Sequence, residues 1–121
     1  MGILVTILTT GKGTWREVSN LINLEDWNKI YIITNEFGEQ NFKCEKEINI
    51  IKINTREPIK IIRDKIINEL KDLSKEIGFN DVAINLTSGT GKEHMALMSA
   101  MMKLGTGIRV ITTENDEIKN L

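Results

Sequence analysis

The sequence VAINLTSGTGK, residues 82–92, indicates the class of fold. Its first five residues, Val82–Leu86, form a short apolar run that is typical of a strand buried on both faces of a sheet. Small and polar residues follow, and Glu93–Leu104 then has the composition of a helix that ends at Gly105. A buried strand, a tight turn and a helix in succession predict one unit of a parallel α/β sheet.

The same alternation of strand and helix extends along the rest of the chain. Apolar and β-branched runs predict four more strands, at Gly2–Leu8, Lys29–Thr34, Ile48–Asn54 and Ile108–Thr112. One helix is expected from Thr14 to Asn23–Asp26 and another from Ile59 to Ile77, with Gly78 as its stop; Asn35–Glu47 is a loop or a short helix. We therefore predict an α/β, Rossmann-like fold with a five-stranded, mainly parallel sheet of order 3-2-1-4-5 and helices on both faces.

Length and composition exclude several classes of protein. The 121 residues suit a single domain, residues 1–121, and a net charge of −1 argues against a partner such as duplex nucleic acid held by bulk electrostatics. No apolar run approaches the roughly 20 residues of a membrane-spanning helix, so we expect no membrane contact by this chain itself. No secretion signal is evident, and the single Cys44 allows no internal disulfide. We expect a cytoplasmic protein or one domain of a longer protein.

Two loops are expected to meet at the ligand-binding edge of the sheet. In the order 3-2-1-4-5 the winding reverses between the first and fourth strands, and ligands bind there at the carboxyl ends of the strands. The loops at that point are Thr9–Thr14 and Thr87–His94, which are the loops richest in Gly, Thr and Lys. The sequence therefore predicts a shared site with these members: Thr9, Thr10, Gly11, Lys12, Gly13, Thr87, Ser88, Gly89, Thr90, Gly91, Lys92 and His94.

The second of these loops has the features of an anion-binding turn. Its glycines allow close approach of the backbone, and the helix that follows offers unpaired N–H groups and a favourable dipole. Lys92 adds a positive charge, and the hydroxyl groups of the turn are potential hydrogen-bond donors. The turn is not a P-loop, because Leu86 replaces the first glycine and Glu93 the hydroxyl residue that contacts magnesium. A purely structural strand-to-helix turn is the alternative.

The first loop and the helix after it carry weaker signals. The loop is not a dinucleotide-binding motif, because Arg16 stands where the third glycine is required. Thr14 and Glu17 have the spacing of a capping box at the start of the helix. His94 is either a ligand contact or acid/base group, or a half-exposed helical side chain. No catalytic residue, metal site or cofactor is predicted.

Residues 84–97, INLTSGTGKEHMAL, resemble the signature of CARF domains, the CRISPR-associated Rossmann-like sensors of cyclic oligoadenylate second messengers. That family typically has an apolar strand, an Asn, a further residue, a Thr or Ser, a small-Gly-Thr-Lys turn and a helix rich in Ala and Met. The similarity extends to the Thr/Gly cluster of the first loop, to Lys29–Asn35 and to Ile108–Thr113. The chain departs from the pattern at Gly91, which is an extra residue between Thr90 and Lys92.

The resemblance implies a homodimer that binds a ring of adenylates, most often cyclic tetra-adenylate, across its two-fold axis. Both loops of each subunit would contribute, with Lys12 and Lys92 meeting phosphates. It further implies a sensor in type III CRISPR antiviral defence that controls an output outside this chain: a nuclease, a winged helix or a transmembrane segment.

Two other functions remain open. Some stand-alone members of the family are ring nucleases, which position a ribose 2′-hydroxyl for attack on its own phosphate, and Lys12, Lys92 and the threonine hydroxyls could support that reaction. The more distant alternative is a nucleotide-binding regulatory domain unrelated to CRISPR.

Overall fold

A single sheet organises the chain. The computed structural model describes residues 2–9, 12–73, 75 and 81–121, and within them six strands have the order β3-β2-β1-β4-β5-β6. Neighbours from β3 to β5 are parallel, and β6 is antiparallel to β5. The predicted order 3-2-1-4-5 is therefore confirmed, and β6 is an additional strand. The strands are β1 Ile3–Leu8, β2 Lys29–Thr34, β3 Asn49–Lys52, β4 Val82–Asn85, β5 Ile108–Glu114 and β6 Glu117–Asn120.

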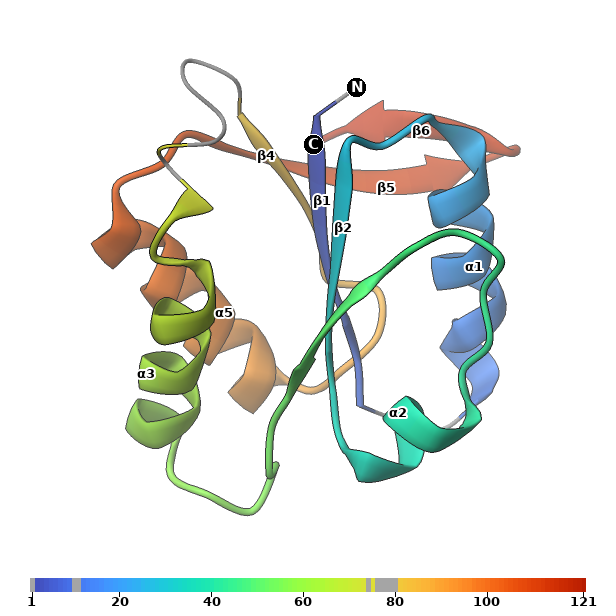
Figure 1. Cartoon of the computed structure of the whole chain (residues 1–121). Coiled ribbons are helices and arrows are strands. Elements are labelled where there is room, and N and C mark those ends of the chain that lie inside the picture. Colours follow the sequence, from blue (N-terminus) through green and yellow to red (C-terminus); the bar gives the residue numbers. More distant parts are fainter. Residues whose placement is uncertain (1, 10–11, 74, 76–80) are drawn as a thin grey trace.

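Helices cover both faces of the sheet, as predicted (Figure 1). On one face α3 and α5 lie side by side, and Ile62 and Leu97 belong to the core there. On the other face α1 packs through Val18 and Ile22. The helices are η1 Lys12–Thr14 (a 3₁₀ helix), α1 Trp15–Leu24, α2 Glu36–Asn41, α3 Ile59–Leu70 and α5 Gly91–Leu104.

Two helix predictions differ from the structure. The segment 35–47, left open as a loop or short helix, contains the six-residue α2. The helix predicted to reach Ile77 is α3, which ends at Leu70, and the expected stop at Gly78 lies outside the described residues. The buried position of Leu73 explains why the apolar periodicity continues past the end of α3.

The centre of the sheet is β1, and all six of its residues are buried. Its fourth residue, Thr6, is the polar exception, and its hydroxyl lies 3.4 Å from both the backbone oxygen and the side-chain oxygen of Asn85 on β4. A strand buried on both faces has no polar face, which is why its sequence reads as a continuous apolar run.

A tight hairpin joins β5 to β6. The residues between these strands, Asn115 and Asp116, have φ values of 52° and 60°. Two successive left-handed residues are typical of the two-residue hairpin turn, and Asn and Asp tolerate this conformation better than most residues. The sequence prediction ended the fifth strand at Thr112 and missed β6, because Glu117–Asn120 is too short and polar to show an apolar pattern.

Candidate functional site

The strand register brings the two predicted loops together. In the pairing of β1 with β4, Thr6 lies opposite Asn85, so Thr9 lies level with the turn that follows β4. The turn is packed tightly against β1 at Gly89, where a Cβ atom would come within 2.7 Å of Ile7 Cγ2 and 3.4 Å of Thr9 Oγ1. Gly89 also has a φ of +97°, a conformation that side chains rarely adopt. Thr9 and the turn after β4 therefore lie side by side.

A buried carboxylate links the two loops. Glu93 lies in the first turn of α5 and is only 3% exposed. It accepts a hydrogen bond of 2.5 Å from the Thr9 hydroxyl, a bond of 3.3 Å from the Thr90 backbone N–H, and a further bond from the Thr90 hydroxyl. Burial by itself would raise the pKa of this carboxyl, but the bonds from Thr9 and Thr90 outweigh it and lower the pKa. Glu93 is thus an internal anion at the junction.

Glu93 was not among the predicted site residues. The signal that could have found it is the spacing Thr90-x-x-Glu93 at a helix start, which is that of a capping box. The same spacing at Thr14 and Glu17 predicted a capping box at the first helix instead. There it is wrong, since the Thr14 side chain makes no cap hydrogen bond.

The start of α5 presents backbone donors beside this junction. Thr90 is the N-cap residue with extended backbone, and Gly91 and Lys92 are the first two helical residues. N–H groups in this first turn have no acceptor within their own helix. Gly91 is exposed, and a Cβ atom there would meet nothing within 4 Å, so the backbone is open to approach from outside.

Lys92 points to a third loop. Its ammonium group donates a 2.7 Å hydrogen bond to the carbonyl oxygen of Thr55, which follows β3. This bond ties the start of α5 to the segment between β3 and α3. An ammonium group has three protons, so Lys92 retains donors for a ligand. Its contact with phosphate stays a prediction.

His94 is held against the turn itself. Its Nε2 lies 2.9 Å from the carbonyl oxygen of the buried Ser88. Because a carbonyl oxygen only accepts, Nε2 carries the proton, and in the neutral ring Nδ1 is then the acceptor. The ring therefore braces the turn through Nε2, while a role in ligand contact remains a prediction.

Two asparagines stiffen the neighbouring strand ends. The side chain of Asn85, at the end of β4, donates to the Thr87 hydroxyl and to the carbonyl oxygen of Ile111, each at 3.0 Å. Asn35, after β2, donates from its side chain to the carbonyl oxygen of Thr9 at 3.2 Å. Neither asparagine was a predicted site residue. The Asn85 side chain also accepts a 3.3 Å hydrogen bond from the backbone N–H of Thr87, so each asparagine holds the backbone of one predicted site residue, Thr87 or Thr9.

The structure describes only part of the first loop. Thr10 and Gly11 lie outside the described residues, and the backbone from Lys12 to Thr14 forms η1. Gly13 is exposed, with nothing within 4 Å of a Cβ atom placed on it. Of the predicted members of this loop, Thr9 is the one that the described structure brings to the turn after β4.

An open pocket of about 480 Å³ adjoins the site at the ends of β2 and β3. It reaches from Asn35 to Thr55, the residues that contact Thr9 and Lys92 respectively. Its charged lining residues are Lys52, Arg56 and Glu36, and Lys52 also lies 3.8 Å from the carboxylate of Glu39. Phe37, which is half exposed, supplies an aromatic ring. The site thus continues into a hollow large enough for part of a nucleotide.

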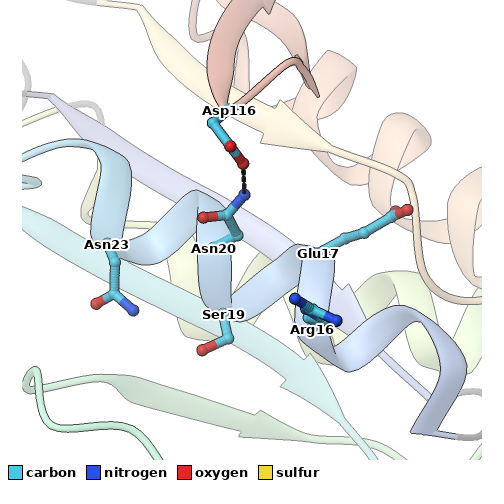
Figure 2. A pocket seen from close by; sticks show the side chains of 6 residues that line it. All are labelled: Arg16, Glu17, Ser19, Asn20, Asn23 and Asp116. Carbon is cyan, nitrogen blue, oxygen red and sulfur yellow. Dashed lines mark hydrogen bonds between the residues drawn. The ribbon is translucent and has the colours of Figure 1, made fainter.

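A second pocket, of about 420 Å³, shares no lining residue with the first. Figure 2 shows it between α1 and the β5–β6 turn, where Asn20 donates a 3.2 Å hydrogen bond to Asp116. Its charged side chains are Arg16, Glu17 and Asp116. With two carboxylates and one guanidinium, this pocket does not suit an anionic ligand.

The described part of the chain shows neither a metal-ligand cluster nor a membrane-spanning helix. No group of three or more His, Cys, Asp or Glu side chains there is placed to hold a metal ion. None of the helices there is long and apolar enough to cross a membrane.

Comparison with known proteins identifies the fold. No protein-family model and no curated protein matches the chain. Among solved structures, Enterococcus italicus Csm6 bound to cyclic hexa-2′-fluoro-hexa-dAMP matches with a TM-score of 0.65 and 15% identity, over 95% of this chain and 34% of Csm6. Can2 from Sulfobacillus thermosulfidooxidans, in complex with cyclic tetra-adenylate, matches with a TM-score of 0.62 and 12% identity, over 98% of this chain and 37% of Can2.

A third match is the protein VC1899 from Vibrio cholerae, with a TM-score of 0.59 and 15% identity, over 98% of this chain and 33% of that protein. The chain therefore has a CARF-like fold, as its sequence resemblance implied. It spans about a third of the length of these proteins.

Proposed function

We propose that the chain is a sensor domain that binds a cyclic oligoadenylate, with cyclic tetra-adenylate as the first candidate, in type III CRISPR antiviral defence. The observation that carries this proposal is the junction of Thr9 with the turn from Gly89 to Lys92, at the winding reversal of a CARF-like sheet. Csm6 and Can2, which match the fold, are bound to cyclic adenylates in their structures. The chain matches about a third of each, so the proposed output lies elsewhere.

The phosphates of the ring would meet the start of α5. The backbone N–H groups of Gly91 and Lys92 have no acceptor within their helix, the helix dipole favours an anion, and the Lys92 ammonium adds charge. The adjoining pocket with Lys52 and Arg56 gives the rest of a nucleotide a place beside these donors.

The proposed assembly is a homodimer, because a two-fold symmetric ring suits two identical patches related by a two-fold axis. Exposed apolar side chains on α5 support a surface for a second copy: Met95 is 60% exposed and Met102 is 76% exposed. Both lie on the helix that begins at the proposed site. Methionine side chains adapt readily to a facing surface.

Calorimetry with cyclic tetra-adenylate and cyclic hexa-adenylate tests the proposal, with the mass of the complex measured by light scattering. We expect one ring per two chains. Absence of binding to every cyclic oligoadenylate, or a strictly monomeric complex, would overturn the sensor hypothesis.

Lys92→Ala provides the matched test of the site. A charge-assisted hydrogen bond is worth about 1.5–3 kcal/mol, so we expect the affinity to fall roughly ten- to a hundredfold. Lys103→Ala is the control, since Lys103 is an exposed residue in the last turn of the same helix. Equal affinity of the Lys92→Ala variant and the wild type would place the phosphates away from this residue.

The same samples test the ring-nuclease alternative. Separation of the ligand after incubation should return the intact ring if the chain is a sensor. A linear di-adenylate with a cyclic phosphate end would instead identify a nuclease.

A further inference from the structure

The carboxylate of Glu93 occupies hydrogen-bond donors that a phosphate was expected to use. Its partners are the hydroxyls of Thr9 and Thr90 and the backbone N–H of Thr90. A negative charge in this position repels a second anion. The place where the two loops meet is therefore already filled by an anion of the chain itself.

The protonation states of the partners determine the direction of these hydrogen bonds. An ionised carboxylate only accepts, so Thr9 and Thr90 each donate the single proton of the hydroxyl group to Glu93. The lowered pKa of Glu93 agrees with an ionised carboxylate at neutral pH. What remains on each threonine oxygen is lone-pair capacity, which can accept a hydrogen bond but cannot donate one.

We propose that Glu93 is a positioning residue that holds Thr9 and Thr90 as hydrogen-bond acceptors, so that this part of the site recognises a donor group of the ligand and not a phosphate. The inference rests on the proposed function and deepens it. A phosphate oxygen has no proton to give at neutral pH, and so it is unsuited to this position. The phosphates would then bind at Gly91 and Lys92, the first two residues of α5.

Two groups of an adenylate ring can donate to these oxygens. They are the ribose 2′-hydroxyl and the 6-amino group of adenine, and for each of them a simple analogue exists that lacks that group alone. Thr9 is partly exposed and Thr90 is exposed, so a ligand can reach both side chains. Both groups are neutral hydrogen-bond donors. An analogue that lacks one of them shows which of the two is recognised.

The decisive experiment measures three rings by calorimetry: cyclic tetra-adenylate, its all-2′-deoxy analogue and cyclic tetra-inosinate. In the wild type we expect the ring that lacks the recognised donor to bind about three- to tenfold more weakly. Thr9→Val should reduce that discrimination, because only the Thr90 acceptor is left, and Thr9→Ser should restore it, because serine keeps the hydroxyl. Thr14→Val is the matched control, and it should leave the ratios unchanged, since the Thr14 hydroxyl has no hydrogen-bond partner.

A phosphate contact at Thr9 would give a different pattern. Thr9→Val would then weaken all three rings by the same factor and leave their ratios intact, which would overturn the inference. If the wild type binds none of the rings, the proposed function and this inference fail together. If it binds them with ratios that Thr9→Val does not alter, only this inference fails.

A measurement without ligand tests the positioning role of Glu93. The carboxyl carbon of Glu93 can be followed by NMR as a function of pH in the wild type and in Thr9→Val. We expect its pKa to rise in the variant, because the variant lacks one of the donors that stabilise the charge. An unchanged pKa would mean that the Thr9–Glu93 bond is absent in solution, and the proposed orientation of the hydroxyl would fall.

Discussion

Two helices of the chain begin with the same spacing of Thr and Glu, yet only one of them uses it. Thr14 is the N-cap residue of α1, and Glu17 lies in the first turn of that helix. Thr90 and Glu93 have the same two positions at α5. Thr14 has helical backbone angles, with φ −98° and ψ −4°, and its side chain makes no cap bond. Thr90 is extended, with φ −114° and ψ 170°, and Glu93 accepts from its N–H.

The difference shows that capping depends on the backbone that enters the helix. A residue at the N-cap needs non-helical angles so that its side chain can face the open N–H groups. At α1 the preceding η1 already turns the chain helically through Thr14, and Glu17 stays exposed. At α5 the chain arrives extended from the turn at Gly89, and Glu93 is drawn inward to Thr9.

The largest effect is expected at the glycines of the two loops. Gly89→Ala should lower the free energy of unfolding by about 3 kcal/mol, from its left-handed φ together with the clash of a Cβ atom at 2.7 Å from Ile7. Gly13→Ala is the control, because a Cβ atom there meets nothing within 4 Å, and a change within about 0.5 kcal/mol is expected. Urea denaturation measures both. Equal losses would show that the two loops are equally constrained.

The second largest effect on the free energy of unfolding is expected from the carboxylates of the two Thr-x-x-Glu spacings, Glu93 and Glu17. Glu93→Gln should lower the free energy of unfolding by about 2 kcal/mol at pH 7, since hydrogen bonds to a charged, buried group are among the stronger ones. Glu17→Gln should change it little, because Glu17 is exposed. A similar loss in both variants would mean that Glu93 is not the anchor seen at α5.

The same carboxylate makes the stability depend on pH in acid. The pKa of Glu93 is lower in the folded chain than its ordinary value of 4.5, so its contribution is present above that value and is lost as the pH falls through the folded pKa. Denaturation at several pH values below 5 should show a smaller acid loss in Glu93→Gln than in the wild type. Parallel pH profiles would contradict the lowered pKa.

A smaller contrast is expected at the threonines. Thr90→Val removes the N-cap hydroxyl and should cost about 1 kcal/mol. Thr14→Val should cost nothing measurable, because the Thr14 hydroxyl is buried without a hydrogen-bond partner and a methyl group suits that place. Thermal unfolding of both variants is the test, and a clear loss in Thr14→Val would restore the capping role predicted from the sequence.

The smallest effect is expected on the outer side of α1. Asn20→Ala removes the hydrogen bond to Asp116 that Figure 2 shows, and because this bond is exposed we expect a loss of less than about 0.5 kcal/mol. The same denaturation assay applies. A larger loss would mean that the β5–β6 turn contributes to anchoring α1.

The order of the first five strands was predictable because these strands are short, apolar and separated by recognisable helices. The closeness of Thr9 to the turn after β4 was predictable as well, since a winding reversal brings the ends of β1 and β4 together in any sheet of this order. The strand β6 was missed because nothing in Glu117–Asn120 shows burial. The direction of Lys92 toward Thr55 was missed because residues 37 positions apart carry no local signal of contact.

The sequence alone therefore determined the fold class, the strand order through β5 and the pair of loops that face the reversal. These features follow from local periodicity and from general rules of chain connection, and both are written in neighbouring residues. Which of the two identical Thr-x-x-Glu spacings buries its carboxylate follows from the folded chain and not from the local sequence. That choice depends on Thr9, which is 84 residues from Glu93 along the chain and 2.5 Å from it in space.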